Sequence, residues 1–167
     1  MGAPNYLAIQ REEGFWPGQA CHPTMGTVQE TYAAAIQHDK AGLPAGTRRV
    51  GVVRRPMGWF HGAVDENRPE LGPPDDLLDA VKEQQAAFEA DGLDDLAALR
   101  KAWMAVDFAD QYERYLDANG AAGDAIDELS EAVRAGTDIA LVCYESPEKP
   151  CHRHLLLDRI QGRIESG

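Results

Sequence analysis

The sequence predicts a small single-domain α/β sandwich with a mainly parallel sheet flanked by helices. Two apolar segments carry this prediction. Residues 48–54 contain three valines and are followed by Pro56 and Gly58, which indicates a short buried strand. Residues 138–144 are apolar at every central position, which is typical of a strand covered on both faces. Helical patterns lie before and after the second strand, and this order favours a layered α/β fold.

The chain is expected to form a single domain over residues 1–167. A protein of 167 residues and this mass buries about 70% of its unfolded surface, which is enough for one core. The sequence has neither an internal repeat nor a linker that would separate two domains. Glycines and prolines leave residues 1–25 poorly assigned, with a possible edge strand at 6–9. The α/β domain itself is expected over residues 27–164.

The first predicted helix covers residues 27–38. Thr27 is its expected N-cap, and Glu30 completes a capping box three residues later. After the strand at 48–54 we expect a long loop over 55–74, a length that is often functional in compact domains. Pro74 is suited to the first position of the next helix. The residues expected on the buried face of that helix are Leu77, Leu78, Val81 and Phe88.

Three further helices are expected before the second strand. They cover residues 93–103, residues 108–116 with Asp107 as the cap, and a segment that starts at Asp124 and stops at Gly136. The last helix is expected over 151–164. Its apolar residues are spaced four apart, at Leu156, Ile160 and Ile164.

The charge balance limits the class of partner. The chain has 28 acidic and 16 basic residues, a net charge of -12, which disfavours binding to nucleic acid polymers or to anionic membranes. Twelve of the basic residues are arginine and four are lysine, a pattern typical of halophilic proteins, although GC-rich coding also favours arginine. No segment has the roughly 20 apolar residues of a membrane span, and the start lacks a secretory pattern. The three cysteines are an odd number without framework spacing, so we expect reduced thiols in a cytoplasmic protein.

The candidate site lies where the second predicted strand passes through a short loop into the last helix. Ligands of open α/β sheets bind at the carboxyl ends of the strands. Cys151, His152 and Arg153 open the helix there, where backbone N–H groups favour anions and stabilise a thiolate. We assign Cys151 and Glu145 as catalytic candidates, and Arg153 and His152 as ligand-binding candidates. In the structural alternative, Cys151 is an inert cap, Arg153 only pairs with a loop carboxylate, and Cys143 packs in the core.

Arg54 and Arg55 follow the first strand and are further ligand-binding candidates. If the two strands are parallel neighbours, these arginines approach the turn at Cys151. Alternation along the strand lets one of them face the site, and Arg54 is the favoured one. Together with Arg153 it would clamp a phosphate or carboxylate.

These residues resemble the hallmark of the family catalogued as domain of unknown function 488. That hallmark is a strand ending in Cys-x-Glu, a short loop, and Cys-His-Arg at the start of the last helix, here residues 143–145 and 151–153. Residues 52–56, 70–73 and 103–115 are similar to the family as well, so the resemblance covers about residues 32–160. It implies a compact α/β fold and a suspected active site around the motif, with no established reaction.

The leading functional hypothesis is a thiol-assisted enzyme acting on a small anionic ligand, phosphorylated or nucleotide-like, with Cys151 as nucleophile. One residue separates Cys151 from Arg153, whereas five separate the cysteine and arginine of the phosphatase loop in protein tyrosine phosphatases, so that activity is not predicted. The first alternative is a non-catalytic module that binds a nucleotide or similar anion. The second is a metal-binding protein using Cys143, Cys151 and His152, although the tight Cys-x-x-Cys spacing of zinc sites is absent. The sequence indicates neither a cofactor nor an oligomeric state.

Overall fold

The computed structural model describes residues 24–166, which form a four-stranded sheet with helices packed around it. The sheet is parallel throughout, in the order β1-β4-β2-β3, which confirms the predicted α/β class. Its strands are β1 (Val28–Tyr32), β2 (Arg48–Gly51), β3 (Glu66–Asn67) and β4 (Ile139–Cys143). The α-helices of the described residues are α3 (Ala33–Gln37), α4 (Asp75–Ala90), α5 (Asp95–Ala105), α6 (Phe108–Ala118), α7 (Gly120–Arg134) and α8 (His152–Ser166).

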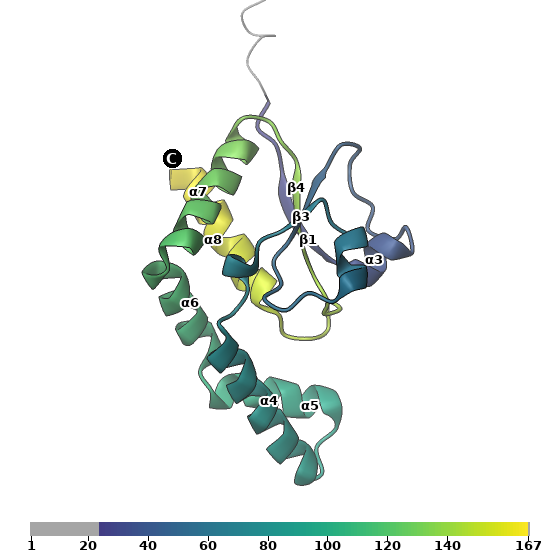
Figure 1. Cartoon of the computed structure of the whole chain (residues 1–167), viewed down its shortest axis with the longest axis vertical. Helices are drawn as coiled ribbons and strands as arrows, with labels where there is room; N and C mark the ends of the chain where they lie inside the picture. Colours follow the sequence, from purple (N-terminus) through teal and green to yellow (C-terminus); the bar gives the residue numbers. More distant parts are fainter. Residues whose placement is uncertain (1–23, 167) are drawn as a thin grey trace, which may run out of the picture.

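Helices lie on both sides of the sheet (Figure 1). Helices α7 and α8 lie side by side on one face, and α8 packs against β1 and β4. Helix α3 lies on the opposite side, together with the 3-10 turn η1 (Gly58–Gly62). Helices α4 and α5 form a hairpin that extends away from the sheet, and α6 leads the chain back to α7.

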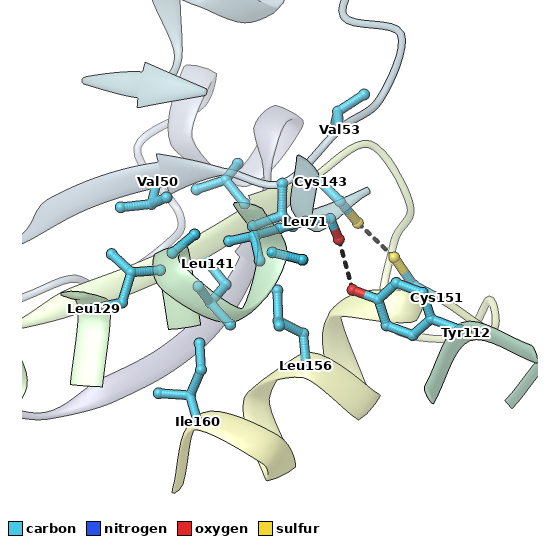
Figure 2. Close-up of a cluster of buried hydrophobic side chains, with 14 of the residues drawn as sticks. Val50, Val53, Leu71, Tyr112, Leu129, Leu141, Cys143, Cys151, Leu156 and Ile160 are labelled. Atoms are coloured by element: carbon cyan, nitrogen blue, oxygen red, sulfur yellow. Dashed lines mark hydrogen bonds between the residues drawn. The ribbon is translucent and has the colours of Figure 1, made fainter. Parts of the chain in front are cut away.

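Strand β4 is the centre of the fold. All five of its residues are buried, which agrees with the prediction that this strand is covered on both faces. It pairs with β1 on one side and with β2 on the other, so the carboxyl ends of β2 and β4 are neighbours. Beneath this strand, Leu141 meets Leu156 and Ile160 of α8 in the core drawn in Figure 2.

The predicted helix over 27–38 is wrong in its first half. Residues 28–32 form β1, and only residues 33–37 are helical. Long-range pairing with β4 overrides the local capping pattern, because the Thr27 carbonyl accepts a hydrogen bond from the Ile139 N–H. The Thr27 N–H in turn donates to the Asp138 carboxylate instead of starting a helix. Glu30 is therefore a strand residue and caps no helix.

Several predicted helix ends also shift. Pro74 is the N-cap of α4 and not its first helical residue, so the helix begins at Asp75, one residue later than expected. Helix α5 begins at Asp95, and Asp94 is its N-cap. Asp107 precedes α6 in a left-handed conformation, at φ 55°, and makes no capping hydrogen bond through its side chain. Helix α7 begins at Gly120, four residues before the expected start, because the Asn119 side chain accepts a hydrogen bond from the Ala122 N–H.

The segment predicted as a loop over 55–74 contains regular structure. Besides η1 it includes β3 and a second 3-10 turn, η2 (Pro69–Leu71). The edge strand considered for residues 6–9 and the thiol of Cys21 lie outside the described residues. Across residues 24–166, no helix combines the length and the apolar character needed to cross a lipid bilayer.

Candidate functional site

The two described cysteines meet at the carboxyl end of β4. Cys143 is the last residue of that strand, and Cys151 immediately precedes α8. Their sulfur atoms point toward each other at a separation of 2.7 Å (Figure 2). Both side chains are buried, yet both border the same cavity of about 340 Å³. The fold therefore brings together two thiols that are eight residues apart in the chain.

Arg153 lies against Cys143. Its guanidinium is almost fully buried, at 1% exposure, and its Nη1 donates to the Cys143 sulfur at 2.5 Å. The same nitrogen donates to the backbone carbonyl of Glu145, also at 2.5 Å. A buried guanidinium in contact with a thiol favours the charged form of that thiol.

The pKa values of the two thiols shift in opposite directions. Burial opposes ionisation of Cys143, but the hydrogen bond from Cys151 and the positive charge of Arg153 outweigh this effect and lower the Cys143 pKa. The hydrogen bond with Cys143, together with burial and the charge on Cys143, raises the pKa of Cys151 well above its ordinary value. The geometry therefore favours Cys143 as the thiolate and Cys151 as the neutral thiol that donates to it.

His152 is a neutral neighbour of the pair. Burial lowers its pKa from 6.5 to about 4, and the charges of Arg153 and His154 act in the same direction. Its Nε2 is 2.6 Å from the Val52 carbonyl, so this nitrogen carries the proton. Its Nδ1 then presents a lone pair 3.7 Å from the Cys151 sulfur. His152 can therefore accept a weak hydrogen bond from Cys151, but it resists protonation.

Glu30 belongs to this arrangement, although the sequence assigned it to a helix cap. Its Oε1 lies 3.7 Å from the Arg153 Nε and also contacts the His154 ring. The Glu30 Oε2 and the Arg153 Nε are buried without a hydrogen-bond partner. The carboxylate thus compensates the buried guanidinium by charge. No local signal could have revealed this role, because it depends on the pairing of β1 with β4.

Arg54 lines the cavity, and several of its donors contact protein acceptors. Its Nε donates to the Pro73 carbonyl, and its Nη2 donates to the Gly72 carbonyl and, at 2.6 Å, to the Tyr115 hydroxyl. Gly72 is required there because a Cβ atom would lie 2.5 Å from the Arg54 backbone nitrogen. Arg54 thus fastens the turn after η2 to α6.

Arg55 and Glu145 also line the cavity. The Arg55 guanidinium forms ion pairs with Asp75 at 2.7 Å and Asp79 at 3.2 Å, both at the start of α4. The Glu145 carboxylate lies 3.6 Å from the ammonium of Lys149, so its backbone carbonyl, and not its side chain, holds Arg153. Arg54, Arg55 and Glu145 share the cavity with the thiols, whereas the Arg153 guanidinium is packed in the core.

The cavity wall combines apolar surface with positive charge. Helices α4, α5 and α6 contribute apolar side chains to the wall, at Leu78, Val81, Leu99, Trp103 and Phe108. The charged side chains of the wall are Arg54, Arg55, Lys82 and Glu145. Because Asp75 and Asp79 pair with Arg55, the positive charge of this wall comes from Arg54 and Lys82, within a protein of net charge -12.

The metal-binding alternative finds no support in residues 24–166. Nowhere in that part of the chain do three or more His, Cys, Asp or Glu side chains form a group that could hold a metal ion. Near the thiols, the Arg153 guanidinium donates to the Cys143 sulfur and places a positive charge where a metal ion would have to bind.

Comparison with known proteins identifies a family. The sequence profile described as the active DUF488-N3 subclade matches residues 32–164. Neither the curated proteins nor the solved structures contain a match to the chain. The matched segment begins at the last residue of β1 and contains the other three strands, the two thiols and nearly all of α8. Because this match spans most of the chain, the protein belongs to the DUF488 family.

Proposed function

We propose that this protein is a thiol-assisted enzyme that acts on a small anionic ligand, phosphorylated or nucleotide-like, at the carboxyl edge of the sheet. The observation that carries the proposal is the contact of Arg153 with the Cys143 sulfur, beside a second thiol and on a ligand-sized cavity. In this arrangement Cys143 is the nucleophile and Cys151 donates a hydrogen bond to it, although the motif alone pointed to Cys151.

The ligand class follows from the cavity wall. Leu99 and Trp103 offer an apolar surface on which a flat group such as a base can pack, and Arg54 and Lys82 supply positive charge for an anionic group. The positive charge of the cavity would attract an anionic ligand that the acidic surface elsewhere repels. Glu145 is suited to proton exchange, since its carboxylate borders the same space.

The alkylation rate of Cys143 tests the nucleophile directly. A Cys21→Ser protein removes the third thiol, and peptide mass spectrometry then reports iodoacetamide addition to each remaining cysteine across pH. We expect Cys143 to react at a pH below the ordinary thiol pKa of about 8.5. Arg153→Met should slow this reaction at neutral pH, and Arg153→Lys, which keeps the charge, should slow it less. Equal reactivity of Cys143 in all three proteins would refute the proposed thiolate.

Protection experiments test the ligand. Adenosine monophosphate or inorganic phosphate should slow the alkylation of Cys143, and Lys82→Ala should weaken this protection. Protection that is absent at millimolar concentrations of both probes would refute an anionic ligand at this cavity.

A non-catalytic anion-binding module remains the second candidate, and one observation favours it. The guanidinium of Arg54 is already fixed by backbone carbonyls and Tyr115, as in a preformed binding wall. Cys143→Ser distinguishes the two functions. A module would bind adenosine monophosphate unchanged and never show turnover, whereas an enzyme would lose turnover and keep binding.

A further inference from the structure

The contact between the two sulfur atoms suits a second kind of chemistry. Cys143 and Cys151 come from different elements, and their sulfur atoms are 2.7 Å apart. A disulfide requires a separation of about 2.05 Å, so the sulfurs need to approach by less than about 1 Å. The connecting loop, residues 144–150, is short, and each of its residues is half-buried or exposed, so it can follow such a shift without disturbing the buried strand.

We propose that Cys143 and Cys151 form a reversible two-electron redox centre, in which a hydroperoxide oxidises Cys143 and Cys151 resolves the product to a disulfide. The inference goes beyond the proposed function, since it assigns the pair a chemistry that needs no bound substrate. It rests on the sulfur–sulfur contact, on the Arg153 N–H at the Cys143 sulfur, and on the cavity that both residues border.

The steps balance in atoms and electrons. The Cys143 thiolate attacks one oxygen of hydrogen peroxide, the O–O bond breaks, and hydroxide leaves, so that Cys143 becomes a sulfenic acid. The Cys151 sulfur then attacks the sulfenic sulfur, the S–O bond breaks, and the thiol proton leaves with the hydroxyl as water. The peroxide gains the two electrons that the two thiols lose, and a thiol reductant reverses the change.

The structure distinguishes the two roles. Arg153 stabilises the charged form of Cys143, and a thiolate reacts with peroxide far faster than a thiol does. Cys151 stays protonated beside it, in the position of a resolving thiol, and its proton is the one that leaves with the hydroxyl as water. Oxidation removes the thiolate that the proposed enzyme needs. The disulfide is therefore an off state that a reducing compartment reverses.

Peroxide treatment of the full chain tests the inference. Reduced Cys21→Ser protein, exposed to hydrogen peroxide, should lose both free thiols and about 2 Da of mass, and dithiothreitol should restore both. Cleavage after Glu145 or Glu148 separates the two cysteines, so only a disulfide would keep the fragments joined. In Cys151→Ser protein, dimedone should trap a sulfenic acid on Cys143. Cys143→Ser protein, the matched variant, should react at least tenfold more slowly.

Two outcomes would overturn the redox centre. The first is oxidised protein whose fragments separate, with oxygen added to a single cysteine. The second is equal dimedone trapping in the Cys143→Ser and Cys151→Ser proteins. Alkylation of the reduced protein tests the Cys143 thiolate that both proposals use, whereas disulfide formation tests the redox centre alone, so the two failures can be told apart.

Discussion

The neutral state of His152 predicts a loss of stability in mild acid. The ring is buried, its Nε2 donates to the Val52 carbonyl, and its pKa falls from 6.5 to about 4 in the folded protein. Between these two values the unfolded chain binds the proton that the folded protein refuses, so stability falls as the pH falls. The linkage relation gives a loss of about 2 kcal/mol between about pH 7.5 and pH 5 from this residue alone.

Urea unfolding at several pH values, followed by circular dichroism, measures this loss. His152→Gln is the matched variant, because its amide can still donate to the Val52 carbonyl but does not titrate. Asp65 and Glu66 have lowered pKa values, and their stabilising charge is lost only as the pH falls below about 4.5, outside this window. The wild type should therefore lose about 2 kcal/mol more than His152→Gln. Parallel losses in the two proteins would show that His152 is not held neutral in the folded protein.

Two further predictions concern the core and the surface. Leu156→Ala should cost about 3 kcal/mol of unfolding free energy, because Leu156 is completely buried beneath β4. Leu157→Ala, on the same helix but only half-buried, should cost about 1 kcal/mol, and equal urea midpoints would contradict the placement of α8. Potassium chloride should raise the thermal midpoint steadily, since salt screens the repulsion within a net charge of -12. A midpoint that does not change with salt would contradict the halophile-like interpretation.

The parts of the fold that the sequence predicts are those with a strong local pattern. The residues of β4 are all apolar, and the regularly spaced leucine and isoleucine of α8 identify its buried face. Residues 28–32 have no such pattern. Their strand exists because Thr27 and Asp138 align β1 with β4 across more than a hundred residues. The local capping pattern at Thr27 therefore predicted the wrong element, since the hydrogen bonds that fix residues 28–32 are long-range.

In the site, too, the sequence predicts the positions along the chain but not the long-range contacts. The motif places Cys151, His152 and Arg153 at the start of α8. The predicted strand over 48–54 is too long, because β2 ends at Gly51, and Arg54 follows it in the loop. The direction of each side chain depends on packing. Arg153 turns into the core because Glu30 of the neighbouring strand compensates its charge there. Spacing alone could not predict that contact.

Under the proposed function, the burial of Arg153 explains how an acidic protein would keep a thiolate at Cys143. Of the cations near the site, Arg55 is paired with exposed carboxylates, and such pairs are weakened by solvent and salt. Arg153 is shielded from both, so its effect on Cys143 persists at any ionic strength in which the protein folds. If the surface is adapted to high salt, a buried arginine is the kind of group that can still control a thiol. Salt should therefore change the stability of this protein far more than the acidity of Cys143.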